Sequence, residues 1–289
     1  MLRLIVQTMR PRQWTKNLAL LVGLVFDRQL TDPDSVMKTL AAVVIFCLMS
    51  GVTYIINDLM DIESDRQHPE KKHRPLASGS LSPKIAITAA ILLGVLLFPA
   101  AFWLSINFGM VVAAYFLVML VYSKWLKNIP LIDVLTIAAG FVLRVSAGVL
   151  VIKVAYFSPW LFLLTTLLAL FLAFGKRQAE LVLLEGQAVN YRKVLRGYTI
   201  ALLDQLILIV LGATLITYSL YTFSATVTPD THAMMFTIPF VMYGLMRYLY
   251  LLHIKNNGGT PEEVLLTDRP IQVAILLWGL AVWVILYLL

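Results

Sequence analysis

Long apolar stretches separated by short charged segments run along the chain from about residue 17 to its end. A helix needs about 20 mostly apolar residues to cross the hydrocarbon core of a bilayer. The pattern predicts nine such helices, at roughly 17–30, 36–57, 83–105, 107–123, 130–152, 157–175, 198–223, 232–252 and 270–288. We therefore expect an all-α membrane protein, a bundle of nine transmembrane helices that forms a single domain over residues 1–289.

The composition excludes a soluble globular protein. The chain is 60% hydrophobic and 13% charged, with a mean hydropathy of +0.84, whereas soluble domains carry about 45–50% apolar and about 25% charged residues. The single cysteine, Cys47, lies within an apolar stretch, which excludes a disulfide framework. Because no small-residue cleavage site closes the first apolar stretch, we interpret it as a span and not as a signal peptide.

Positive residues are distributed unequally between the two sides of the predicted bundle. Of the 23 Lys and Arg residues, 19 fall on the side of the N-terminus, and three, Arg28, Lys38 and Lys153, fall on the other. Because Lys and Arg gather on cytoplasmic segments, we expect a multi-pass protein of the cell (plasma or inner) membrane with a cytoplasmic N-terminus and an external C-terminus. This topology accounts for the net charge of +7 without a nucleic-acid partner.

An acidic motif of the form N-D-x-x-D-x-x-x-D ends the second predicted span, running from Asn57 to Asp65. At about 100° per residue, Asp65 returns to within about 20° of Asp58, and Asp61 lies about 60° away, so the carboxylates share one helical face. A divalent cation removes their mutual repulsion, and such oxygen ligands suit Mg²⁺ shared with phosphates. We predict Asp58, Asp61 and Asp65 as magnesium ligands and catalytic residues, with Asn57 assisting, in a cavity on the cytoplasmic side.

Basic residues near this motif have two interpretations. Lys71, Lys72 and Arg74 are suited to holding phosphate charge, or they belong to a solvated loop whose charges pair on the surface. Lys16, before the first span, and Lys124, after the fourth, are likewise either phosphate ligands or positive-inside anchors.

Two further charged residues, Asp133 and Arg144, lie within the fifth predicted span. They face the same side of the helix, about 16 Å apart along its axis. Charge within a span is costly and is usually functional or paired. Arg144 either binds a lipid phosphate or pairs with a neighbouring helix.

At the acidic motif the chain resembles the UbiA-type intramembrane prenyltransferase superfamily, in which N-D-x-x-D-x-x-x-D follows the second of nine helices. It is more narrowly similar to the decaprenyl-phosphate phosphoribosyltransferase branch. The segments that carry this narrower resemblance occur in order and in matching loops: Arg10–Asn17, His68-Pro69, Arg74-Pro75, Gly175–Leu181, Gly258–Glu263 and Asp268-Arg269.

The resemblance implies transfer of 5-phosphoribosyl from 5-phosphoribosyl 1-diphosphate to a polyprenyl (decaprenyl-type) phosphate, with Mg²⁺ as cofactor and diphosphate as the leaving group. It implies a product used for arabinose donors of the cell envelope, as in arabinogalactan synthesis. The oligomeric state is left open, and a homo-oligomer is compatible with the sequence. Together with the spacing arguments it gives these substrate-binding residues: Lys16, Asn57, Arg66, Lys72, Arg74, Tyr122, Lys124, Lys176, Arg177, Glu180 and Arg192.

One departure from the wider superfamily bears on the substrate. Aromatic prenyltransferases carry a second aspartate-rich motif after the sixth span, but here that loop contains Lys176, Arg177 and Glu180 and has no aspartate before Asp204. The added positive charge suits a donor with an extra phosphate. Two alternatives remain open: an aromatic prenyltransferase that uses a polyprenyl diphosphate and a 4-hydroxybenzoate-type acceptor, and a carrier or lipid-binding bundle.

Overall fold

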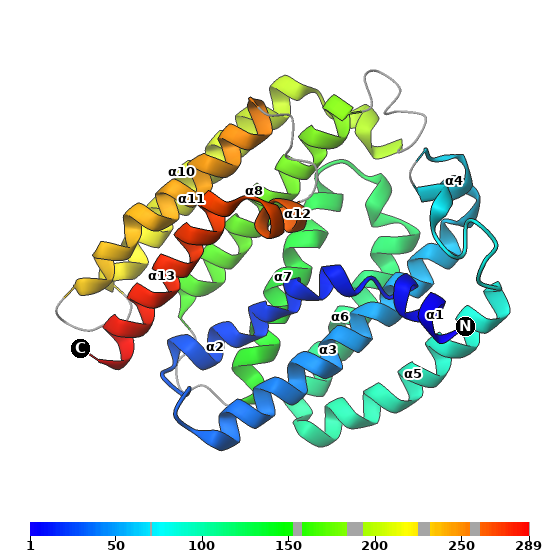
Figure 1. Ribbon diagram of the computed structural model, residues 1–289, viewed down its shortest axis with the longest axis horizontal. Coiled ribbons are helices and arrows are strands. Elements are labelled where there is room, and N and C mark those ends of the chain that lie inside the picture. The colour runs from blue at the N-terminus through cyan, green and yellow to red at the C-terminus, as the bar shows by residue number, and fades with distance from the viewer. Residues whose placement is uncertain (70, 153–157, 184–192, 225–231, 255–260, 289) are drawn as a thin grey trace. The chain divides into compact units, whose positions relative to one another are not determined.

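The computed structural model describes residues 1–69, 71–152, 158–183, 193–224, 232–254 and 261–288 (Figure 1). Within these residues every regular element is a helix. Contacts divide the chain into two compact units. The first unit comprises Met1–Leu24, Leu30–Thr136 and Leu143–Val154, and the second comprises Val25–Gln29, Ile137–Val142 and Ala155–Leu289.

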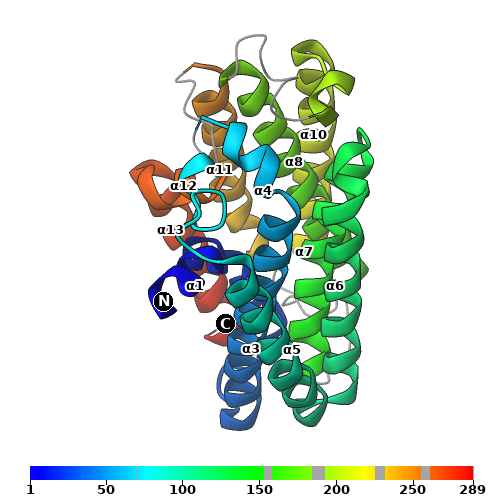
Figure 2. The ribbon, with the colours of Figure 1, turned by 90° about the vertical axis from the view of Figure 1, so that its right-hand side faces the viewer.

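The first unit is built around three long helices that pack side by side, α3, α5 and α6 (Figure 2). Short helices flank them, and α7 contributes its two ends to this unit. The bounds are α1 (Leu2–Thr8), η1 (Pro11–Leu20), α2 (Leu21–Phe26), α3 (Pro33–Met60), α4 (Ile62–Gln67), η2 (Lys71–His73), α5 (Pro83–Leu104), α6 (Ile106–Lys124), η3 (Leu126–Asn128) and α7 (Ile132–Val151).

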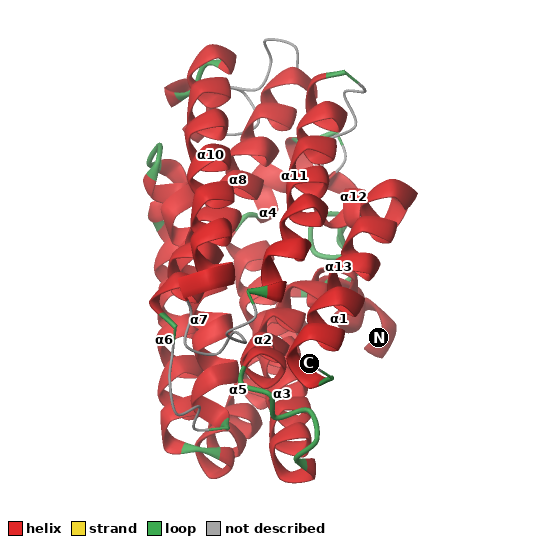
Figure 3. Cartoon of the chain, turned by 90° about the vertical axis from the view of Figure 1, so that its left-hand side faces the viewer, coloured by secondary structure: helices red, strands yellow, loops and turns green. Residues whose placement is uncertain are grey.

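In the second unit α8 packs along α10, and α11 packs along α13 (Figure 3). The α13 helix begins at the Asp268 side chain, which accepts a hydrogen bond from the backbone N–H of Ile271. The bounds are α8 (Pro159–Leu183), η4 (Lys193–Gly197), α10 (Ile200–Ser224), η5 (Ala233–Thr237), α11 (Ile238–His253), α12 (Pro261–Thr267) and α13 (Arg269–Tyr287).

Eight helical segments of the described chain are long and apolar enough to cross a membrane, and they coincide with eight of the nine predicted spans. The protein is therefore a multi-pass membrane protein. The predicted span at 17–30 differs, because the 3₁₀ helix η1 leads into the six-residue α2. A 3₁₀ helix rises about 2.0 Å per residue and an α-helix about 1.5 Å. Within the predicted span, residues 17–26 are helical and extend about 17 Å, which is shorter than the hydrocarbon core of about 30 Å.

The length of α3 carries the acidic motif out of the apolar layer. Its 28 residues extend about 42 Å at 1.5 Å per residue, whereas the hydrocarbon core is about 30 Å thick. The helix begins with Asp32 as its N-cap and Pro33 in its first turn, both favoured there. It ends at Met60, and α4 follows after Asp61.

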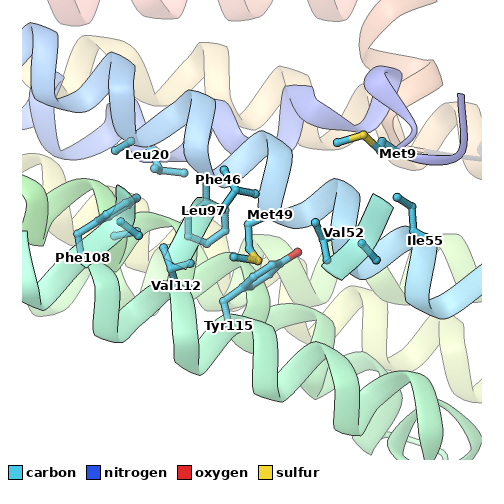
Figure 4. Packing of buried hydrophobic residues seen from close by; sticks show 14 of the residues in the cluster. Met9, Leu20, Phe46, Met49, Val52, Ile55, Leu97, Phe108, Val112 and Tyr115 are labelled. Atoms are coloured by element: carbon cyan, nitrogen blue, oxygen red, sulfur yellow. The ribbon is translucent and has the colours of Figure 1, made fainter. Parts of the chain in front are cut away.

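The apolar core of the first unit lies between α3, α5, α6 and the N-terminal segment, which comprises residues 1–20 (Figure 4). Phe46 and Met49 of α3 are fully buried, and Phe46 packs on the ring of Tyr115 from α6 at 4.8 Å between centroids. Leu20 of η1 is buried in the same cluster. This packing holds the N-terminal segment against α3, whose end carries the acidic motif.

Candidate functional site

Asp58 and Asp65 of the acidic motif converge on one basic group. The Nη1 atom of Arg74 lies 3.2 Å from Oδ1 of Asp58 and 2.6 Å from Oδ2 of Asp65. Arg10 forms a second ion pair with the same Oδ1 atom of Asp58. Both carboxylates are buried, Asp58 with 2% of its surface exposed. The shared face predicted from the spacing assumed one continuous helix, whereas Asp58 lies in α3 and Asp65 in α4.

The third carboxylate, Asp61, has different partners. Asn57 donates from Nδ2 to its Oδ2 atom at 3.1 Å, and Lys127 of η3 pairs with its Oδ1 atom. Asp61 is the residue between α3 and α4, where the α-helical backbone is interrupted. At this interruption, the carboxylate of Asp61 has partners other than those of Asp58 and Asp65.

The N-terminal segment supplies a layer of polar side chains beside the carboxylates. The guanidinium of Arg10 lies over the ring of Tyr54, 4.9 Å from its centroid. The hydroxyl of Tyr54 donates to Oε1 of Gln13 at 2.9 Å, and Lys16 donates to the same oxygen at 3.1 Å. Lys16, a predicted substrate-binding residue, therefore belongs to the segment that places Arg10.

Arg10 marks a sharp change of direction in the backbone. Its φ angle of 55° is left-handed, a conformation that a residue with a side chain adopts at a cost of about 1–3 kcal/mol. The residue separates α1 from η1. Such a conformation is retained only where surrounding contacts stabilise it, and the ion pair with Asp58 is one such contact.

A second polar network lies deeper in the first unit. Arg144 of α7, 5% exposed, donates from Nε to Oδ1 of Asn17 at 2.8 Å and from Nη2 to the hydroxyl of Tyr115 at 2.8 Å. Asn17 donates in turn to Ser50 at 3.3 Å. Arg144 is 12 residues into α7, about 18 Å from its start. These contacts agree with the interpretation of Arg144 as a pair with neighbouring elements.

The other predicted residues of the first unit form none of the ion pairs described for Asp58, Asp61 and Asp65. Arg66 pairs with the exposed Glu63 at 3.0 Å, and Lys72 is exposed in η2. Lys124 lies over the ring of Trp125, 4.4 Å from its centroid, and Tyr122 is half-buried. Their proposed contacts with substrate stay predictions.

The predicted residues of the second unit gather at the end of α8. Arg177 is 1% exposed and pairs with Oε2 of Glu180 at 2.9 Å, and Lys176 is half-buried beside it in the sequence. Arg192 lies outside the described residues. An arginine guanidinium stays positively charged even when it is buried.

A groove of about 380 Å³ also lies in the second unit, and none of the predicted residues lines it. Asp204 and His253 form its polar end, with Nε2 of His253 lying 3.0 Å from Oδ1 of Asp204. Gln178 of α8 donates to the same oxygen. The rest of the lining is apolar apart from Tyr250.

Two of the three predicted carboxylates are arranged in a way that suits a magnesium ion. Asp58 and Asp65 direct oxygens to one point that a cationic nitrogen occupies, and Mg²⁺ is held by one or two carboxylates, with water and phosphate oxygens completing its shell. The described residues contain no group of three acidic, histidine or cysteine side chains placed to hold one ion. Asp61 would join such a group only after leaving Lys127.

Sequence reasoning did not select Arg10 or Lys127 as site residues. Arg10 was part of the basic segment Arg10–Asn17, and Lys127 lies three residues after Lys124. The signal available was the density of positive charge before the first span and after the fourth. Which of these cations reach the carboxylates depends on contacts 48 and 66 residues apart in the chain.

Comparisons with known proteins agree with this fold. The family model described as "UbiA prenyltransferase family" matches residues 18–262. The decaprenyl-phosphate phosphoribosyltransferase of Mycolicibacterium smegmatis is 32% identical over 289 residues, which cover 95% of this chain and 89% of that protein. The protein of the same name from Corynebacterium glutamicum is 29% identical over 293 residues, covering 98% and 86%.

A solved structure of a UbiA homolog from Archaeoglobus fulgidus bound to DMAPP and Mg²⁺ has the same fold. Its TM-score is 0.72 at 17% sequence identity, with 99% of both chains covered. The extent of the family match and the identity to the mycobacterial protein show that this chain is a transferase and belongs to the UbiA prenyltransferase family.

Proposed function

We propose that the protein transfers 5-phosphoribosyl from 5-phosphoribosyl 1-diphosphate to a polyprenyl phosphate in the membrane. The bond between C1 of the ribose and the diphosphate oxygen breaks, a bond from C1 to an oxygen of the lipid phosphate forms, and diphosphate leaves. The observation that carries the proposal is the convergence of the buried Asp58 and Asp65 on one cation position at the end of α3. The names of the relatives support the choice of donor and acceptor.

Asp58 and Asp65 would hold Mg²⁺, with Asp61 as a third ligand after separation from Lys127. When bound, the ion supplies charge neutralisation for the leaving diphosphate. Arg74, which already lies between the two carboxylates, would bind phosphate oxygens. The lipid phosphate is an anion before it reacts, so the chain needs no strong general base. Positive charge that develops at C1, as in other glycosyl transfers, would be stabilised by nearby negative charge.

The charge pattern of the sequence after residue 175 supports a donor with more than a diphosphate. The segment from Lys176 to Asp204 has no aspartate before Asp204, so it lacks the ligands that a second ion would require. It contributes instead the buried Arg177 and the half-buried Lys176. Fixed positive charge of this kind suits the 5-phosphate of the donor.

The proposal includes an orientation in the membrane. The excess of Lys and Arg on the side of the N-terminus supports an orientation in which the acidic motif and the end of α3 face the cytoplasm, where a water-soluble phosphorylated sugar is available. With η1 and α2 as a ninth crossing, the C-terminus lies outside. All nine crossings then form the single domain expected from the sequence.

The test is a diphosphate-release assay in detergent with Mg²⁺. One reaction contains phosphoribosyl diphosphate and polyprenyl phosphate, and the other contains polyprenyl diphosphate and 4-hydroxybenzoate. We expect release in the first alone, with a phosphoribosylated lipid as product and loss of activity in EDTA. Release in the second alone would replace the proposal with an aromatic prenyltransferase.

Asp58→Asn and Asp65→Asn should each lower turnover about 100-fold or more, because loss of a residue that merely orients a metal ligand costs about 10–100-fold. The matched control is Glu63→Gln, which makes the same change of charge at an exposed position between them, 84% exposed. Elution of each variant from a sizing column as wild type checks folding. Near-normal turnover in both Asp variants would contradict the assignment.

A further inference from the structure

Asp58 is enclosed by two guanidinium groups that come from different segments. Arg10 reaches it from the turn between α1 and η1, and Arg74 reaches it from the segment after η2. Both contact the same Oδ1 atom, and only 2% of Asp58 is exposed. Any other cation that binds this oxygen must therefore compete with an arginine.

The cluster is close to electrically neutral as it stands. Arg10 and Arg74 balance Asp58 and Asp65, and Lys127 balances Asp61. A divalent cation that enters alone is repelled by these positive groups, and a diphosphate that enters alone is repelled by the carboxylates. When both enter, the metal ion takes the carboxylate and the diphosphate takes the arginine. Opposite charges therefore remain adjacent throughout.

Arg10 is suited to change partners because its position does not depend on Asp58 alone. Its guanidinium lies 4.9 Å from the centroid of the Tyr54 ring, and arginine stacks on aromatic faces while its planar edge binds oxygens. Tyr54 is held through its hydrogen bond to Gln13. After leaving Asp58, the guanidinium would still lie beside the cluster, with an edge that matches two phosphate oxygens.

We propose that Arg10 makes the binding of the divalent cation and of the substrate diphosphate interdependent, by exchanging its ion pair with Asp58 for one with the diphosphate. Arg10 is thus a binding residue that competes with the metal in the absence of substrate and assists it in the presence of substrate. The inference rests on the proposed function only in that the donor carries a diphosphate. By linkage, each ligand must tighten the binding of the other by the same factor.

The test measures Mn²⁺ binding to the purified full-length chain in detergent, from the electron paramagnetic resonance signal of free Mn²⁺. Inorganic diphosphate is the second probe, and the free signal is calibrated without protein at each diphosphate concentration. For wild type we expect diphosphate to tighten Mn²⁺ binding about tenfold, within the usual range of about 5–150-fold for coupled sites.

Arg10→Gln should tighten the binding of Mn²⁺ alone about tenfold. It should also reduce the effect of diphosphate severalfold, to the part that comes from direct attraction between the ion and the diphosphate. The matched control is Arg12→Gln, the same loss of charge in the same segment, at an exposed residue with no ion pair in the described structure. It should leave the affinity for Mn²⁺ alone and the effect of diphosphate within about twofold of wild type, since exposed charges at a distance are screened. A general effect of charge would instead change both variants equally.

Unchanged Mn²⁺ binding in Arg10→Gln would overturn the proposal, because it would mean that Arg10 does not compete for Asp58. Weaker Mn²⁺ binding would also overturn it, because it would mean that Arg10 prepares Asp58 for the metal. If Arg10→Gln does not fold, Arg10→Lys decides the question. It keeps the charge but loses the planar edge, so Mn²⁺ alone should bind about threefold tighter, and a value equal to wild type would contradict the exchange.

These results are separate from those that test the proposed function. Both substrate pairs of the release assay include a diphosphate donor. If only the reaction with polyprenyl diphosphate and 4-hydroxybenzoate proceeds, the phosphoribosyl donor is rejected and the proposed exchange at Arg10 is unaffected. Phosphoribosyl transfer with Mn²⁺ binding that is insensitive to Arg10→Gln would reject the exchange alone.

Discussion

A single methyl group at Gly148 tests how the N-terminal segment is held in the first unit. Gly148 lies in the last turn of α7, and a Cβ atom built on it would lie 1.9 Å from the carbonyl oxygen of Leu20 in η1. Real Cβ atoms essentially never approach closer than 3.0 Å. Because the obstructing atom belongs to the backbone, Gly148→Ala requires α7 and η1 to move apart by about 1 Å.

The expected magnitude is the difference between two opposing effects. Replacing glycine by alanine within a helix contributes about 0.5–1 kcal/mol of stability, whereas overpacking costs about 1–3 kcal/mol. A clash with the backbone belongs near the upper end of that range, so we expect a net loss of about 1–2 kcal/mol. For chains of this size, each 1 kcal/mol lowers Tm by about 2–4 °C, which predicts an apparent Tm lower by about 2–8 °C.

The assay is thermal unfolding in one detergent, followed by tryptophan fluorescence, with Gly212→Ala in α10 as the control. No atom lies within 4 Å of a Cβ built on Gly212, so only the helix-stabilising effect remains and the apparent Tm should rise. The same substitution is therefore expected to change stability in opposite directions at the two positions. A Gly148→Ala variant as stable as wild type would refute the close approach of α7 and η1.

Two further predictions concern polar contacts. Asn17→Leu should destabilise the protein more than Arg144→Met, because it leaves the buried guanidinium of Arg144 without this acceptor, whereas Arg144→Met removes the buried charge itself. Leaving a buried charged group unsatisfied costs more than replacing it by an apolar one. Chemical unfolding of both variants checks this order, and the reverse order would contradict it. Asp268→Ala should lower the apparent Tm more than Arg247→Ala, because Asp268 both caps α13 and pairs with Arg247, and a lost cap costs about 1 kcal/mol. An equal loss in the two variants would show that the cap contributes nothing.

Most of the fold follows from the apolar pattern alone. Eight of the predicted spans occur as long helices, because an apolar segment in a bilayer must satisfy its backbone hydrogen bonds internally. Seven have ends within three residues of those expected, whereas α8 continues to Leu183, eight residues beyond the predicted end at 175. The expectation that Lys176, Arg177 and Glu180 lie in a loop is therefore wrong, because they lie in α8. The first predicted span shows where this reasoning stops. Hydrophobicity sets which residues enter the apolar layer, but it does not distinguish the 3₁₀ turns of η1 from an α-helix.

The acidic motif could likewise be located from the sequence. Helical periodicity predicted that Asp58 and Asp65 share one face of a helix, but the helix is interrupted between them at Asp61. Periodicity relates residues only within a single helix. Which cations meet the carboxylates of the motif depends on how separate segments pack, and two of the partners lie far away in the chain: Arg10 is 48 residues from Asp58, and Lys127 is 66 residues from Asp61. The sequence by itself therefore determined the membrane fold and the acidic centre, whereas the tertiary structure alone decided which basic group neutralises each carboxylate.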